Sequence, residues 1–213
     1  MILRSFLGTM KIVIFGSTGM TGLCVVEAAL KKGYEVRAFV RDPSKFPEEL
    51  QSKVELFKGD VLEADSVTNA VEGTDGVIIA LGTRGNLDPT SDMSEGTKNI
   101  IDAMRGKHVN TVSACISAFL FYEEDKVPER FIPVTKDHKR MYEELKGSGV
   151  NWVAVFSPHI SDDPSRDIIV EVNPEKSPGR AVSKHDLGKF LVDSLTEPKY
   201  YKAVIGLCNV PKA

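Results

Sequence analysis

The sequence has few cysteines and no arrangement of them that suggests a disulfide framework. The three cysteines among 213 residues are odd in number and far apart, without Cys-x-x-Cys or metal-ligand spacing. Their surroundings are apolar, as in a protein core; they are Cys24, Cys115 and Cys208. We therefore expect no metal site and a reducing, cytoplasmic location.

Long apolar runs and an excess of positive charge are also missing. No stretch approaches the roughly 20 apolar residues that a membrane span needs, and 27 basic against 30 acidic residues give a net charge of -3. Without a basic field, a protein is a poor partner for nucleic acid or an acidic membrane surface. The sequence predicts a soluble monomer that binds neither.

No linker composition, low-complexity tract or internal repeat divides the chain. Residues 1–10 are apolar but too short for a secretory signal, so we treat them as an N-terminal extension, with Met10 as an alternative start. Residues 11–213 are expected to form a single domain, since a chain of this length can bury its own core.

Short apolar runs alternate with segments of helical periodicity. Strands are predicted at 11–15, 35–40, 54–58, 77–81, 111–116 and 152–156. Helices are clearest at 23–32, 93–104, 136–147 and 184–195, the last with Ser183 as its N-cap. The alternation predicts an α/β fold, a single Rossmann-like, doubly wound parallel sheet flanked by helices. Because ligands bind beyond the carboxyl ends of such strands, we expect the turn-rich segments 86–90, 122–133 and 162–180 to form the ligand-facing rim.

A glycine-rich turn lies between the first predicted strand and the first helix. A pyrophosphate needs backbone N–H groups at a helix start and no side chain in the way, which glycines provide. The alternative is a tight turn without a ligand. The hydroxyls of the two threonines are expected either to donate to phosphate oxygens or only to cap the helix. The residues expected to bind the cofactor here are Gly16, Thr18, Gly19, Met20, Thr21 and Gly22.

The residue after the second predicted strand selects between the two nicotinamide cofactors. A carboxylate there binds the ribose 2′-OH, whereas an arginine accommodates a 2′-phosphate. Arg41 occupies this place with Lys45 nearby, although Asp42 would favour NAD. Because a guanidinium fork matches a phosphate better than a hydroxyl, we predict NADPH. The alternative is that Arg41 and Asp42 form a solvated surface pair.

Two further strand ends carry candidate cofactor contacts. After the third strand come Asp60 and Val61, where the carboxylate is expected either to accept a hydrogen bond from the adenine amino group or to cap a helix. After the fourth strand, Leu81-Gly82-Thr83-Arg84 brings a glycine close to the cofactor. Arg84 is available to phosphate or substrate acid groups, or is a plain loop residue.

These motifs occur together with Met93-Ser94-Glu95-Gly96, Ser117-Ala118-Phe119, Pro158-His159-Ile160 and Ser183-Lys184-His185-Asp186-Leu187-Gly188. In this combination the chain resembles, nearly end to end, the biliverdin-IXβ reductases. They are also called NADPH-dependent flavin reductases and are atypical, NmrA-like short-chain dehydrogenases/reductases.

The resemblance implies that NADPH reduces flavins (FMN, FAD, riboflavin) or biliverdin-type linear tetrapyrroles. It places Ser117 and His159, as catalytic residues, beside the nicotinamide, with Ile160 among the cofactor contacts. Phe119 is implied as an apolar wall for the acceptor ring, and Tyr122 as a further substrate contact.

A Tyr-x-x-x-Lys pair, the acid-base pair of many short-chain dehydrogenases, occurs at Tyr142 and Lys146. Counting back from the sixth strand puts both in the later turns of their helix, away from the crevice, where a surface pair is the better interpretation. By the same count, Val134 and His138 occupy the positions near the helix start where the catalytic pair would lie. Since a ketone needs an acid and a conjugated acceptor does not, this favours an acceptor that delocalises charge. The rival hypothesis is an NmrA-like NADP(H)-binding redox sensor that acts through a protein partner.

Overall fold

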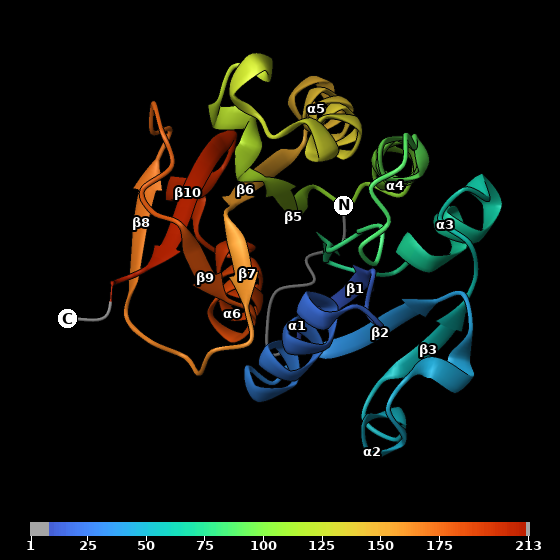
Figure 1. Cartoon of the computed structure of the whole chain (residues 1–213). Coiled ribbons are helices and arrows are strands. Elements are labelled where there is room, and N and C mark those ends of the chain that lie inside the picture. Colours follow the sequence, from blue (N-terminus) through green and yellow to red (C-terminus); the bar gives the residue numbers. More distant parts are fainter. Residues whose placement is uncertain (1–8, 212–213) are drawn as a thin grey trace.

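The computed structural model describes residues 9–211, so the N-terminal extension lies mostly outside the described residues. The described part contains an eight-stranded sheet with the strand order β3-β2-β1-β4-β5-β6-β10-β8 (Figure 1). Neighbouring strands run parallel except β8, which is antiparallel to β10. The predicted Rossmann-like fold is confirmed, with an added antiparallel edge.

The strands of this sheet are β1 (Lys11–Phe15), β2 (Glu35–Val40), β3 (Glu55–Lys58), β4 (Gly76–Ile79), β5 (Thr111–Ser117), β6 (Asn151–Ser157), β8 (Ile168–Val172) and β10 (Ala203–Asn209). A separate two-stranded sheet pairs β7 (His159–Ser161) with β9 (Ala181–Ser183). The helices are α1 (Met20–Lys31), α2 (Glu48–Gln51), α3 (Ala64–Val71), α4 (Asp92–Gly106), α5 (Ile132–Gly147) and α6 (Lys184–Ser194). Short 3-10 turns lie at Pro43–Lys45, Ala118–Phe121, Glu124–Lys126, Glu129–Phe131 and Pro198–Tyr200.

Helices cover both faces of the sheet and bury one hydrophobic core on each side. On one face, side chains of α3, α4 and α5 such as Val67, Ile100 and Met141 pack against the strands. On the other face, α1 and α6 bury residues such as Val25 and Leu191. Because both faces are covered, the central strands are apolar runs without alternation, as parallel sheets require.

The carboxyl ends of the parallel strands meet along one edge. Phe15, the last residue of β1, is level with Phe39 of β2 and with Ile79 of β4. Ser117 at the end of β5 is level with Ser157 at the end of β6. The strand order reverses between β1 and β4, and a crevice opens at such a point in this class of fold.

Some element boundaries differ from the prediction. Helices α1 and α5 begin three or more residues earlier than expected, at Met20 and Ile132, and Ser183 caps α6 by accepting a hydrogen bond from the N–H of His185 at 3.3 Å. The expectation that 162–180 forms the ligand rim is wrong. This segment contains β8, which pairs with β10 at the far edge of the sheet and does not line the main cavity.

Candidate functional site

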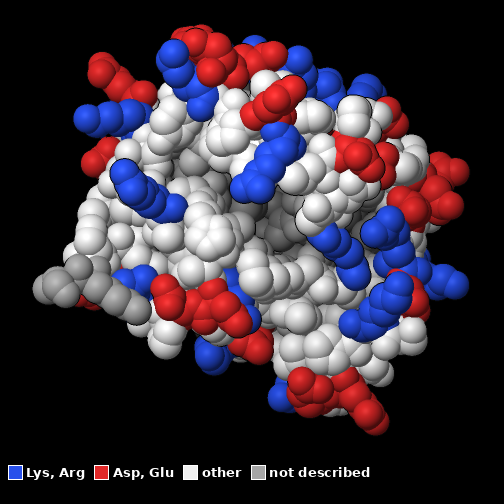
Figure 2. All heavy atoms as spheres, in the orientation of Figure 1, with Lys and Arg blue, Asp and Glu red and all other residues white. Residues whose placement is uncertain are grey.

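A cavity of about 930 Å³ lies at the carboxyl ends of the strands. Figure 2 shows this face hollowed at its centre, with Lys and Arg side chains around a mainly uncharged hollow. Residues at the ends of the first six strands, or directly after them, contribute to the wall, together with the starts of α1 and α4 and one side chain of α5. Among the lining residues are Gly16, Thr18, Gly19, Met20, Thr21, Arg41, Lys45, Asp60, Val61, Leu81, Gly82, Thr83, Arg84, Cys115, Ser117, His138, Ser157, Pro158 and Ile160.

The glycine turn has the geometry that a pyrophosphate requires. Gly16 has a φ of +85°, and a Cβ on it would lie 2.2 Å from the carbonyl oxygen of Ala80. A Cβ on Gly22 would lie 2.0 Å from the carbonyl oxygen of Gly16. Gly19 is the N-cap of α1 and no side chain caps the helix, so the first N–H groups remain available to an anion. The turn therefore fits a dinucleotide phosphate, and capping of α1 by a threonine does not occur at this N-cap.

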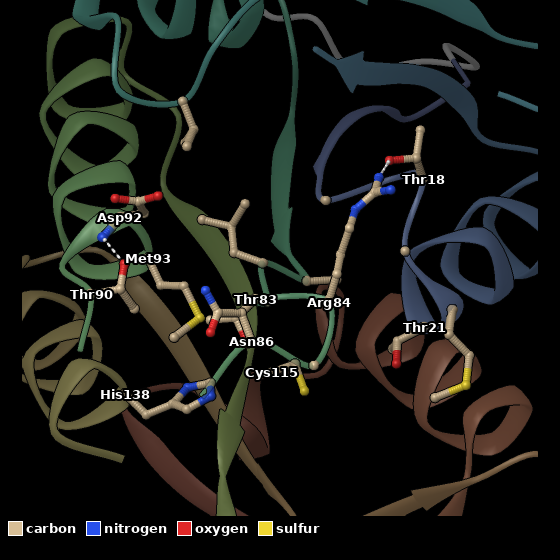
Figure 3. A pocket seen from close by; sticks show the side chains of 18 of the residues that line it. Thr18, Thr21, Thr83, Arg84, Asn86, Thr90, Asp92, Met93, Cys115 and His138 are labelled. Atoms are coloured by element: carbon tan, nitrogen blue, oxygen red, sulfur yellow. Dashed lines mark hydrogen bonds between the residues drawn. The ribbon is translucent and has the colours of Figure 1, made fainter. Parts of the chain in front are cut away.

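An arginine from the loop after β4 reaches across to this turn. The guanidinium of Arg84 donates a hydrogen bond to Thr18 Oγ1 at 2.7 Å, as Figure 3 shows. Arg84 itself has a φ of +54°, which is uncommon for a residue other than glycine. The contact brings a positive charge beside the anion-ready start of α1.

Cationic side chains follow the end of β2, and the carboxylate beside them, that of Asp42, is already hydrogen-bonded to Ser44. Asp42 accepts hydrogen bonds from the N–H of Ser44 at 3.1 Å and from its hydroxyl at 2.7 Å, and these bonds hold the pKa of Asp42 below its usual value. Lys45 lies 3.8 Å from the same carboxylate. Arg41 is exposed and has no hydrogen-bond or ion-pair partner among residues 9–211. Its guanidinium is thus free to meet a ligand.

Asp60 and Val61 line the cavity after β3. The carboxylate of Asp60 accepts a hydrogen bond from the N–H of Leu62 at 3.0 Å, which closes a local turn. The N-cap of α3 is Glu63, so Asp60 does not have the capping role considered for it.

On the other side of the cavity, Ser117 ends β5 and accepts a hydrogen bond from the N–H of Phe119 at 3.2 Å. Cys115, which the sequence suggested as a core residue, lines the cavity instead, and burial raises the pKa of its thiol to about 12. Pro158 and Ile160 also line it, whereas His159 between them is exposed and does not. The structure thus brings Ser117 to the cavity and leaves His159 outside it.

The two aromatic residues expected to touch the acceptor lie beyond the cavity lining. Phe119 packs against Tyr122 at 6.4 Å and against Phe131 at 5.2 Å between ring centroids. Tyr122 is 52% exposed. Phe119, Tyr122 and Phe131 form an aromatic cluster that follows Ser117 in the chain. None of the three lines the cavity.

The Tyr142 and Lys146 pair lies away from the cavity, as the helix count predicted. The Tyr142 ring packs edge-on against Trp152 and Phe156, with centroid distances of 6.0 and 5.3 Å. Val134 packs against the core. His138 lines the cavity, although the sequence indicated only its place near the helix start. The local sequence could not predict this contact, because it depends on how α5 packs against strands that are distant in the chain.

Within residues 9–211, no group of three or more His, Cys, Asp or Glu side chains is arranged to hold a metal ion. None of the helices described is long and apolar enough to cross a membrane.

Solved structures with a similar backbone support the fold. A Rossmann-fold NAD(P)-binding family protein from Shigella flexneri superposes with a TM-score of 0.77 at 20% identity, over 97% of this chain and 98% of that one. A wide-type short-chain dehydrogenase/reductase from Veillonella parvula, solved in complex with NADP, gives a TM-score of 0.76 at 16% identity, over 94% of both chains. At these identities the likeness concerns the fold.

Sequence relatives extend the comparison. An uncharacterized chloroplastic protein of Arabidopsis thaliana is 27% identical, over 96% of this chain and 79% of its own length. A photosystem II assembly factor of Cyanophora paradoxa is 30% identical over 67% of this chain, which spans only 43% of that protein. The model of the NAD(P)H-binding family matches residues 16–198, a span that contains the glycine turn, Arg41, Arg84 and Ser117. The chain therefore belongs to the NAD(P)H-binding family, an oxidoreductase-type family with a Rossmann-like fold.

Proposed function

We propose that the protein is an NADPH-dependent reductase of flavins and biliverdin-type linear tetrapyrroles. The observation that carries the proposal is a single cavity that joins an anion-ready glycine turn to Ser117 and contains no Tyr-x-x-x-Lys pair. A site without that acid suits an acceptor whose own conjugation spreads the incoming charge.

The choice of NADPH is supported by the charges at the end of β2. Arg41 has no partner within the described residues, while Asp42 is tied to Ser44 and is poorly placed to select a ribose hydroxyl. A free guanidinium with Lys45 nearby matches a 2′-phosphate. The glycine turn would hold the pyrophosphate through backbone N–H groups, and Arg84 would add a charged contact.

The chain's own residues act mainly by binding and orientation. NADPH, when bound, supplies the hydride. Ser117 would position the reacting groups through its hydroxyl, and the walls of the cavity would exclude water from them. The proton that completes the reduction can then come from solvent, because a conjugated anion persists long enough to collect it. A role for His159 at this step stays a prediction.

A regulatory role is the second candidate. It is supported by the similarity to the photosystem II assembly factor of Cyanophora paradoxa, a protein named for assembly and not for catalysis. Under this hypothesis the cavity binds NADP(H) as a redox signal, and a partner protein responds.

The cytoplasmic location and monomeric state expected from the sequence also stay predictions, and the Arabidopsis relative is chloroplastic.

Turnover separates the two candidates. The purified protein is mixed with NADPH and, separately, with FMN, biliverdin-IXβ or biliverdin-IXα, and NADPH oxidation is followed by absorbance. The reductase hypothesis predicts multiple turnovers with FMN or biliverdin-IXβ, and slower oxidation with NADH. Tight NADPH binding without oxidation in any mixture would reject it and favour the regulatory hypothesis.

A further inference from the structure

His138 of α5 lies on the wall of the cavity opposite the glycine turn (Figure 3). Its Nδ1 atom is buried and has no hydrogen-bond partner among residues 9–211. A buried polar atom without a partner costs about 1 to 3 kcal/mol, so native proteins keep few of them. Because buried N–H groups without an acceptor are rarer than unpaired acceptors, this enclosed atom is better left as a lone pair.

The same helix face carries a second unsatisfied atom. Thr135 Oγ1, one turn before His138, is also buried without a partner in the described part of the chain. Between them, Asp137 is fully buried and well satisfied: it accepts from the N–H of Met93 at 3.1 Å and from Arg140 at 3.0 Å. The bond from Met93 ties α5 to the start of α4, so His138 is held in place while its ring stays unpaired.

The ring is neutral at physiological pH. Burial lowers the pKa of His138 to about 4, and the carboxylate of Asp137 offsets this only in part. Charged side chains of mixed sign line the same cavity from other elements: Arg41, Asp42, Lys45, Asp60, Arg84, Asp88 and Asp92. A neutral imidazole has one N–H and one lone pair. Because no acceptor among residues 9–211 lies within reach of Nδ1, the proton is better placed on Nε2, where a ligand in the cavity can accept it.

We propose that His138 binds the acceptor, donating a hydrogen bond from its neutral ring to a carbonyl oxygen of a conjugated substrate. This inference rests on the proposed reductase function. Arrival of a hydride makes such an acceptor negative and spreads charge onto its carbonyl oxygens. A preorganised N–H donor stabilises that charge and keeps its own proton, as neutral imidazoles do in other enzymes. The site therefore selects ring systems with carbonyl groups at their edge, as in flavins and linear tetrapyrroles.

Three variants test this role. His138→Ala removes the donor, His138→Gln replaces it with an amide N–H, and Lys139→Ala changes the exposed neighbouring residue on the same helix. For each, we would measure binding of FMN and biliverdin to the NADP⁺-loaded protein by fluorescence, NADPH affinity by titration, and single-turnover reduction of FMN from pH 5.5 to 8.5.

His138→Ala is expected to weaken acceptor binding and to slow reduction by roughly 10- to 100-fold, with NADPH affinity within twofold. His138→Gln should recover most of the loss, and Lys139→Ala should match the parent. Since the ring stays neutral throughout this pH range, the parent and Gln profiles should run parallel.

Unchanged acceptor binding and reduction in His138→Ala would overturn the inference. The inference would also be overturned if the reduction rate of the parent changed with pH near 6 to 7 and that of His138→Gln did not. Such a result would make His138 a proton donor. If the parent binds FMN in a His138-dependent way but does not reduce it, the proposed function fails and the inference survives. If the parent binds neither acceptor, both fail.

Discussion

The two halves of the cavity are built in different ways. The nucleotide half, residues 11–84, is formed by the glycine turn and by loop residues that follow directly on β2, β3 and β4. The acceptor half, residues 111–160, combines the ends of β5 and β6 with a side chain from the middle of α5. Local chain geometry makes the first half, whereas packing between distant elements makes the second.

The difference predicts how each half responds to substitution. Truncating a side chain cannot remove a backbone N–H, so the glycine turn is most sensitive where an added Cβ would displace the backbone that presents these groups. In the acceptor half the functional atoms belong to side chains, so single truncations should change catalysis and leave the cofactor in place.

Gly16→Ala should have the largest effect. Its Cβ would meet the carbonyl oxygen of Ala80 at 2.2 Å, at a φ of +85°. We expect unfolding free energy to fall by about 3 to 4 kcal/mol and NADPH binding to be lost. Gly33→Ala is the matched control, because Gly33 has a φ of +80° with no atom within 4 Å of a new Cβ, and it should lose only about 1 to 2 kcal/mol. Urea unfolding and NADPH titration measure both; equal losses would show that the close approach is unimportant.

Acid should lower the unfolding free energy of the protein through His138, which belongs to the acceptor half. The folded pKa is about 4, and the unfolded side chain titrates near its usual value of about 6.5. Because the unfolded chain takes up the proton first, stability falls as the pH drops from 6.5 to 4, by at most about 3 kcal/mol. Urea unfolding between pH 7.5 and 4.5 should show this loss in the parent and a smaller one in His138→Gln. Parallel curves would contradict a buried neutral ring.

Arg41→Ala, in the nucleotide half, should weaken the binding of NADPH much more than that of NADH. NADPH loses a charge-assisted hydrogen bond worth about 1.5 to 3 kcal/mol, so its Kd should rise roughly 10- to 100-fold, while the Kd of NADH stays within twofold. Lys53→Ala, which removes an exposed cation outside the cavity lining, is the control. Fluorescence titration measures both cofactors, and equal weakening would mean that Arg41 does not read the 2′-phosphate.

Ser117→Ala should lower single-turnover hydride transfer by about 5- to 50-fold, because positioning is lost while phosphate contacts remain. NADPH affinity should stay within twofold. A serine that only positions its neighbours does not titrate near neutrality, so the pH profiles of variant and parent should keep the same shape. Loss of a pH-dependent limb would instead assign Ser117 to a proton relay, with His159 as the first partner to examine.

Tyr142→Phe should have the smallest effect. The ring would keep its contacts with Trp152 and Phe156, which lie outside the cavity, so FMN reduction should stay within about twofold of the parent. A fall of about 100-fold, the size expected for loss of a general acid, would contradict the placement of Tyr142 outside the acceptor half. Steady-state rates with FMN and NADPH suffice for this comparison.

Much of the nucleotide half could be predicted because its signals are local. Glycines between an apolar run and a helical segment, and a basic residue directly after the second strand, lie within a few residues of the elements that position them. The parallel sheet followed from apolar runs alternating with helices. The segment 162–180 could not be predicted, since turn-forming residues there surround a strand whose pairing with β10 depends on a partner more than 30 residues away.

The sequence by itself determined the Rossmann-like fold, the glycine turn and the cationic end of the second strand, because backbone conformation and strand order act over short stretches of chain. Only the tertiary structure decided that His138 and Cys115 line the cavity, and that His159 lies outside it. Those outcomes depend on how α5 packs against α4 through Asp137, and on which face of a short strand turns inward. Side-chain direction at such places is set by contacts between elements distant in sequence, so no local pattern records it.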